Sequence, residues 1–195
     1  MSKCWWLPNP DIGKDKLFIS TFDKYVKSYP RPDYLIIQAG SNDLRVVKGK
    51  ELIENIRADI MRLAILSPEI KIIWSDILPR RYCHFGDNHG AIEGTRKRVN
   101  IAVRKVVKEE IINRYVISHP NITEKERTLY RNDGTHLSDV GNDVFLNNVQ
   151  AALESYLQTE NRCFPWNRNI SYFGWELFCS IIRVERVALP RTPLL

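Results

Sequence analysis

The chain has 195 residues, a length that suits one domain and leaves little room for a second. It is 44% hydrophobic and 27% charged, which is enough apolar material for a sizeable core, and its net charge of +6 bears on association rather than on fold. No apolar run approaches the roughly 18 residues of a membrane span, and Pro8 and Pro10 interrupt the apolar start of the chain. The sequence therefore predicts neither a membrane protein nor a signal peptide, and favours the cytoplasm or nucleus.

The first clear elements of the chain follow the pattern of a parallel sheet. Residues 34–38 form a short, continuous apolar run that leads at once into small polar residues at 40–43. Apolar residues then recur at helical spacing over 52–64, and this helix should end before Pro68. Residues 70–78 read as a second buried strand. The order strand, helix, strand is the start of an α/β arrangement.

The same alternation continues towards the C-terminus. Apolar residues at 92–107 predict a second helix, and residues 115–117 predict a third strand. A polar loop over 119–137 precedes a last helix, for which Ser138 is the expected N-cap. Strands and helices in this order predict an α/β sandwich with a parallel sheet and helices on both of its faces.

The two ends of the chain are less regular. Residues 4–7 could form a short strand and residues 17–29 a helix, whereas the periodicity fades after residue 159. We therefore expect a domain at 1–159 and an irregular C-terminal tail at 160–195. The cysteines are far apart and form no CxxC pair, so free thiols are expected rather than disulfides. They are Cys4, Cys83, Cys163 and Cys179.

Two polar clusters lie where α/β proteins bind ligands, outside the carboxyl ends of strands. The first is Gly-Ser-Asn-Asp at 40–43, and the second is Asp-Gly-Thr-His at 133–136. A carboxylate three residues before a histidine can accept from one imidazole nitrogen, which leaves the other as a general base. The Asn42 amide and the backbone N–H of a glycine can donate to an oxyanion. Alone, each cluster is a turn or a surface loop, but together they point to acyl transfer.

These blocks resemble conserved blocks of the SGNH hydrolases, the GDSL-type esterases. Residues 32–44 look like the third block of that family, and residues 133–138 look like the fifth. Three segments are also similar to SGNH-like domains of retrotransposon-derived proteins, namely 47–53, 74–81 and 136–143. The resemblance runs over about residues 32–157. It implies a three-layer α/β/α sandwich of the SGNH, flavodoxin-like kind.

The resemblance also implies roles for four residues. Asp133 and His136 match the last two members of the catalytic triad, while Asn42 and Gly40 match the oxyanion-hole block. The first block of the family is a strand followed by Gly-Asp-Ser, whose serine is the nucleophile, and no Gly-Asp-Ser occurs in this chain. Gly13 is the only candidate for the second-block glycine, and its context is poor.

The missing first block predicts an SGNH-type esterase-like domain that is N-terminally truncated and weak or inactive as given. Its partner would be a small ester substrate, and no cofactor or metal is expected. Loss of the first strand should also leave a neighbouring strand unpaired, which favours self-association.

No serine of this chain is a convincing substitute for the nucleophile. Ser41 occupies the variable position of the third block, and Ser75 lies inside a predicted strand before its carboxyl end. Ser20 falls in a predicted helix, and Ser138 is better explained as a helix cap. The nucleophile is therefore unknown, because geometry and not mere presence makes a triad.

The remaining charged residues leave a second interpretation open. Residues 80–108 carry eight basic side chains against Asp87 and Glu93, and clustered cations can bind nucleic-acid phosphates. The chain would then be a nucleic-acid- or partner-binding relic of a mobile element, or a gene fragment without function. A solvated helix face is preferred, because no aromatic residues interleave. The basic residues are Arg80, Arg81, Arg96, Lys97, Arg98, Arg104, Lys105 and Lys108.

Three histidines outside the predicted site have simpler interpretations. His84 and His89 flank a short loop that offers too few ligands for a metal, so they are expected to be exposed. His119, before Pro120, is expected to be structural or exposed.

Overall fold

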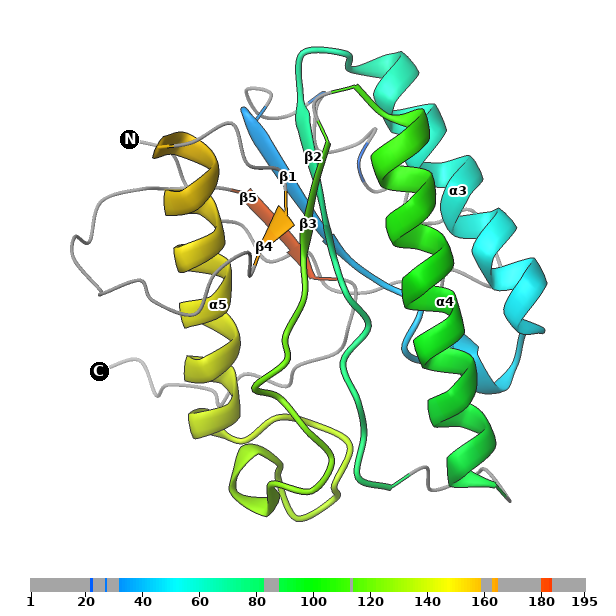
Figure 1. Ribbon diagram of the computed structural model, residues 1–195, viewed down its shortest axis with the longest axis vertical. Helices are drawn as coiled ribbons and strands as arrows, with labels where there is room; N and C mark the ends of the chain where they lie inside the picture. The colour runs from blue at the N-terminus through cyan, green and yellow to red at the C-terminus, as the bar shows by residue number, and fades with distance from the viewer. Residues whose placement is uncertain are drawn as a thin grey trace.

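The predicted alternation of strands and helices is confirmed in a computed structural model (Figure 1). It describes residues 22, 27, 32–82, 88–112, 114–158, 163–164 and 180–183. The regular elements are β1 (Tyr34–Gln38), α3 (Gly49–Leu66), β2 (Lys71–Ser75), α4 (His89–Glu110), β3 (Arg114–Ile117), α5 (Asp139–Gln158), β4 (Cys163–Phe164) and β5 (Ser180–Arg183). Two short 3-10 helices, η1 (Asp43–Arg45) and η2 (Arg127–Leu129), lie in loops. The strand predicted at 4–7 lies outside the described residues, as does all but Phe22 and Lys27 of the helix predicted at 17–29.

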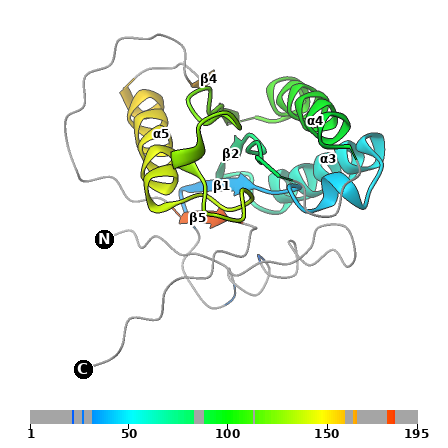
Figure 2. The same cartoon turned by 90° about the horizontal axis from the view of Figure 1, so that it is seen from below.

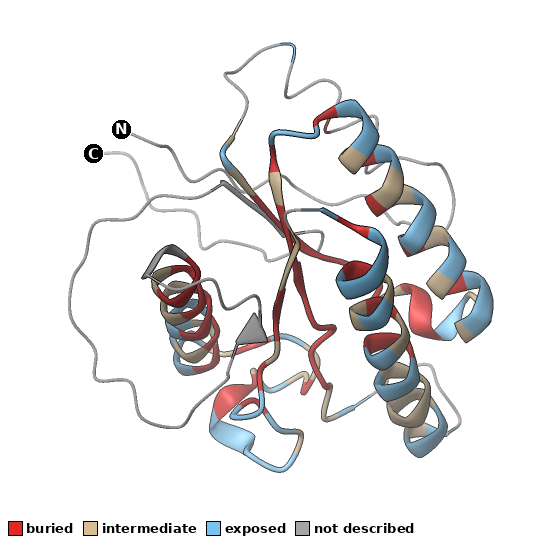
Figure 3. Ribbon diagram, turned by 45° about the horizontal axis from the view of Figure 1, so that its top comes forward, coloured by how far each residue is buried: buried red, intermediate tan, exposed pale blue. Residues whose placement is uncertain are grey.

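The sheet is parallel and is covered on both faces, as the α/β prediction requires. Helices α3 and α4 lie on one face and α5 on the other (Figure 2). Successive strand side chains point to opposite faces, so Ile37 and Trp74 pack with Val103 of α4, whereas Ile36 packs with Phe145 of α5. Figure 3 shows the buried residues along the strands and on the sheet-facing sides of the helices. No helix in the described part of the chain has the length and apolar character of a membrane span.

The helix ends follow the local sequence signals. The Ser138 hydroxyl accepts a hydrogen bond from the Gly141 N–H at 3.1 Å, so Ser138 caps α5 as predicted. A side chain at Gly141 would collide with the carbonyl of Leu129, so a glycine allows η2 to pack directly on the first turn of α5. Helix α3 ends at Leu66, before Pro68, as the proline predicts.

The edges of the sheet differ from the expectation. The strand order is β4-β3-β2-β1-β5, so β1, β2 and β3 are each paired on both sides. The unpaired edge expected for a neighbour of the missing first strand is not found on these three strands. β5 pairs with β1 in parallel, with Gln38 opposite Arg183, and β4 pairs with β3. Both edge strands come from residues 160–195, which the sequence predicts to be irregular; the domain boundary at 159 stays a prediction.

The parallel order brings three loops to one edge of the sheet. Strands β1, β2 and β3 all end there, and the chain leaves them through residues 39–42, 76–82 and 118–138. Gly40 turns the chain directly after β1 with a φ of +94°, a conformation that side chains disfavour. A side chain at this position would also lie 3.1 Å from the Ile77 Cδ1. The two polar clusters predicted from sequence lie in the first and third of these loops.

Candidate active site

The structure brings Asp133 and His136 together. The His136 Nδ1 lies 2.6 Å from the Asp133 Oδ2, and the Asp133 Oδ1 accepts from the backbone N–H groups of Thr135 at 2.8 Å and His136 at 2.9 Å. Gly134 makes the turn between them with a φ of +61°, and a Cβ there would lie 2.2 Å from the Tyr82 ring. The loop therefore fixes both carboxylate oxygens, and its tight turn requires a glycine.

The charge of Asp133 is stabilised by these contacts. Partial burial works to raise the pKa of Asp133, but hydrogen bonds from the His136 ring and from two backbone N–H groups outweigh it and lower the pKa to about 2. An ionised Asp133 favours the tautomer of His136 with its proton on Nδ1, so Nε2 can accept a proton. The two side chains are 40% and 44% exposed, so this base is open to solvent.

Asn42 follows the turn at Gly40 and is oriented by an arginine. The Arg80 Nη2 donates to the Asn42 Oδ1 at 2.7 Å. This bond uses the oxygen of the amide, so the nitrogen is the donor that an oxyanion would meet. The Leu44 N–H donates to the Gly40 carbonyl at 3.2 Å and starts the short helix η1.

A short segment after β2 connects the two polar clusters. Arg80 holds Asn42, while the backbone N–H groups of Arg81 and Tyr82 donate to the Gly134 carbonyl at 2.8 and 3.2 Å. Asn42 and the Asp133–His136 loop are therefore tied to the same segment at the same edge of the sheet. From the sequence, Arg80 and Arg81 are expected to be basic residues of the 74–81 segment, and no role in the site is assigned to them. Their place directly after a buried strand and Pro79 is the signal that could have identified them.

No serine serves His136 in the part of the chain that the structure describes. The His136 side chain makes its hydrogen bond to Asp133 and makes none to a serine. The Ser138 hydroxyl donates to a backbone carbonyl and caps α5, and Ser41 forms no hydrogen bond with a histidine. Ser20, Gly13 and His84 lie outside the described residues. The nucleophile stays unassigned.

A serine and a histidine do meet elsewhere, at the ends of β2 and β3. The Ser75 Oγ lies 2.9 Å from the His119 Nε2, and the Asn148 Nδ2 lies 3.1 Å from the His119 Nδ1. Asn148 also exchanges two hydrogen bonds with Asn121, at 3.0 and 2.7 Å. Sequence reasoning misses this cluster, because its members come from β2, the loop after β3 and α5. No local motif joins them.

The Ser75–His119 contact lacks the access that a catalytic pair needs. The Asn148 amide lies against the His119 Nδ1, and the tautomer of the ring decides whether Nε2 donates to Ser75 or accepts from it. Ser75 is 0% exposed, and the neighbouring N–H groups of Asp76 and Ile77 are bonded to other acceptors. The cluster is a buried structural network.

The eight basic residues of segment 80–108 do not form a continuous phosphate-binding face. Arg96 donates to Glu93 at 2.7 and 2.6 Å and to the Ile77 carbonyl, and Arg104 makes a two-point contact with Asp76. Burial raises the pKa of Asp76, although hydrogen bonds and charge from Arg104 oppose this effect. Two of the eight basic residues, Arg96 and Arg104, are therefore engaged in contacts within the fold. No three His, Cys, Asp or Glu side chains of the described residues gather where a metal could bind.

Comparison with known proteins identifies the fold. Comparison with models of protein families finds no match, and comparison with curated proteins finds none. A mutant acetyl esterase, solved with an acetate ion, has a TM-score of 0.53 at 17% identity over 69% of this chain and 63% of its own. A Bacteroides fragilis protein assigned as an acylhydrolase gives 0.54 at 21% identity over 73% and 70%. An acetyl xylan esterase gives 0.51 at 18% identity over 74% and 76%.

At these identities the likeness shows the fold alone. The chain shares the α/β fold of these esterase and acylhydrolase structures, with a parallel sheet between layers of helices. It spans about three fifths of the length of the acetyl esterase and of two further similar solved structures.

Proposed function

We propose that this chain is an SGNH-type esterase-like domain that retains the acid–base half of an ester-hydrolysing site. Asp133 and His136 are the acid–base pair, and Asn42 with Gly40 binds the oxyanion. The observation that carries the proposal is the 2.6 Å contact between the His136 Nδ1 and the Asp133 Oδ2. The resemblance to domains of retrotransposon-derived proteins supports an origin in a mobile element.

The proposed chemistry follows from the orientation of the imidazole. Asp133 accepts the Nδ1 proton and stabilises the imidazolium that forms when Nε2 takes a proton from a nucleophile. The Asn42 amide nitrogen and the Gly40 N–H would donate to the oxyanion that develops on the ester carbonyl. Arg80 supports this role, because its bond to the amide oxygen fixes which end of Asn42 is the donor.

The proposed activity as an esterase is weak or absent. The chain contains no Gly-Asp-Ser, and none of the described serines is hydrogen-bonded to His136. With the nucleophile lost, an oxyanion hole and substrate binding can still leave on the order of 10³-fold catalysis over water. Water activated by His136 would be the nucleophile in that case. The acetyl esterases among the solved structures support a small acyl group as the substrate class.

Hydrolysis of 4-nitrophenyl acetate tests this proposal. We expect slow turnover without a burst, which His136→Ala and Asp133→Asn both reduce. His89→Ala is the matched control, because His89 is a partly exposed histidine outside the pair. Its rate should equal that of the wild type.

Two results would count against the proposal. Equal rates for the wild type and His136→Ala would show that the pair is not the base. A burst followed by turnover in the ordinary enzyme range, about 1–10³ s⁻¹, would show a complete enzyme instead of half a site.

A further inference from the structure

A cavity of about 520 Å³ opens at the carboxyl edge of the sheet, away from the proposed ester site. Its volume is within the range of about 300–1,000 Å³ that small-molecule sites occupy. The end of β2 and the residues after it form one wall, α4 forms the second, and residues 118–125 form the third. Neither Asn42 nor His136 lines it, so the cavity is a separate site.

Most of the negative charge in this cavity is already neutralised. Arg104 makes a two-point contact with Asp76, and Arg96 makes one with Glu93. The third carboxylate, Glu124, is partly exposed and lies 3.4 Å from the His89 Nε2. These two arginine–carboxylate pairs are therefore part of the cavity walls. Each pair adds little net charge to the surface that a ligand would contact.

Two lysines from different walls give the cavity its positive character. Lys97 lies on α4 with a side chain that is 64% exposed, and its Nζ is 3.5 Å from Glu93. Lys125 comes from the wall formed by residues 118–125, is exposed, and pairs with no carboxylate among the described residues. Two ammonium groups that line one cavity can both provide charge-assisted donors to an anion.

The walls are held in place before any ligand binds. His119 lines the cavity, and its ring is fixed by Ser75 on one nitrogen and Asn148 on the other. The Arg96 Nη1 donates to the Ile77 carbonyl at 2.7 Å and joins α4 to the segment after β2. A preformed site loses less entropy when it binds, so these contacts favour recognition of a small ligand.

We propose that this cavity binds a small molecule with a phosphate or carboxylate group, held between Lys97 and Lys125. The apolar residues Ile77, Leu78 and Ile122 line the same cavity and would contact the rest of such a ligand. This site does not depend on ester hydrolysis, because it shares no residue with the Asp133–His136 pair.

Titration of the full chain with inorganic phosphate, followed by backbone amide NMR shifts, tests the proposal. We expect shifts at residues 93–97 and 118–125 that saturate at low ionic strength and weaken with salt. Lys97→Ala and Lys125→Ala should each weaken binding by about three- to tenfold, as expected for one exposed charge-assisted contact. The arginines are not substituted, because removal of Arg104 would leave the buried Asp76 carboxylate without its partner, and removal of Arg96 would break the contact between α4 and the Ile77 carbonyl.

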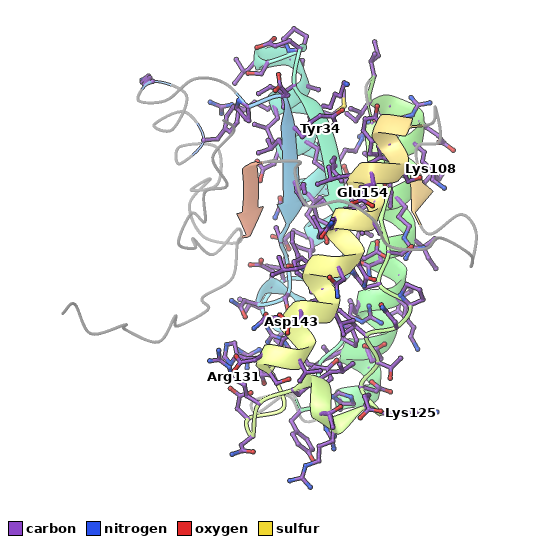
Figure 4. The ribbon with its side chains drawn as sticks, turned by 90° about the vertical axis from the view of Figure 1, so that its left-hand side faces the viewer. Tyr34, Lys108, Lys125, Arg131, Asp143 and Glu154 are labelled. Carbon is purple, nitrogen blue, oxygen red and sulfur yellow. The ribbon has the colours of Figure 1, made fainter. Side chains whose placement is uncertain are left out.

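Lys108→Ala is the matched control, because it removes one exposed lysine from the last turn of α4, the helix that carries Lys97. Figure 4 shows Lys108 and Lys125 at opposite ends of the molecule. The Lys108→Ala variant should bind phosphate as the wild type does. A parallel titration with acetate separates the two ligand classes, because a phosphate site and a carboxylate site will prefer different anions. The proposal fails if neither anion binds, if Lys108→Ala has the same effect as the other two, or if the shifts centre on residues 40–43 and 133–136.

Discussion

Two histidines in the described part of the molecule, His136 and His119, make contrasting contacts, and each has what the other lacks. His136 is exposed and is oriented by an ionised Asp133, but it has no serine among the described residues. His119 has a serine at 2.9 Å, but both side chains of this pair are buried. The comparison shows that a short serine–histidine distance does not make a catalytic site. The serine must also be accessible to a substrate.

The largest expected effect is on stability, and it separates the two histidines. His119→Ala should destabilise the fold by about 2–4 kcal/mol, because it opens a cavity, removes the buried partner of the Ser75 hydroxyl and leaves Asn148 with Asn121 alone. His136→Ala should change the free energy of unfolding by no more than about 0.5 kcal/mol, as for other exposed positions. Urea unfolding of the two variants measures the difference. Equal losses would contradict the assignment of His119 as the structural histidine.

A smaller effect is expected from the turn that holds the exposed pair. Gly134→Ala should cost about 1–2 kcal/mol, because the position has a φ of +61° and a Cβ would collide with Tyr82. Gly90→Ala is the matched control in the first turn of α4, where a Cβ meets only ordinary contacts. It should be neutral or stabilising by up to about 1 kcal/mol. If Gly134→Ala melted at the wild-type temperature, the loop would not be held as described.

The pH dependence of the exposed pair gives a smaller effect still. The pKa of Asp133 is about 2 in the folded chain against 3.8 for an unperturbed carboxyl. A lowered pKa means that the contribution to stability is complete above about pH 4 and is lost as pH falls through about 2. Since the side chain is 40% exposed, solvent screening limits this contribution to about 1 kcal/mol or less. The stability difference between the wild type and Asp133→Asn should therefore disappear between about pH 5 and 2, by about that amount. A difference that is constant with pH would show that the His136 contact does not hold the charge.

Much of the fold could be predicted from the sequence because its signals are local. The continuous apolar run at β1, the helical spacing over α3 and the cap at Ser138 each specify their own element. The strands β4 and β5 could not be predicted this way. They are two and four residues long, and only pairing with β3 and β1 makes them strands.

The contacts of the site could likewise be predicted only where they are local in the sequence. Asp133 and His136 are three residues apart, so one loop determines their contact and a sequence motif can reveal it. Arg80 and Asn42 are 38 residues apart, and Ser75 and His119 are 44 apart. Their contacts depend on which strands are neighbours in the sheet. A single sequence does not show this for isolated polar residues.

Labelling with a serine-reactive fluorophosphonate, followed by mass spectrometry of the intact chain, tests the central claim most directly. The proposed account is that His136 is a base without a serine partner and that Ser75 is too deeply buried to act as a nucleophile. We therefore expect no stoichiometric labelling of the wild type, and no change in His136→Ala or His119→Ala. Stoichiometric labelling of one serine that is lost in His136→Ala would contradict the account, because it would show a complete triad in this chain.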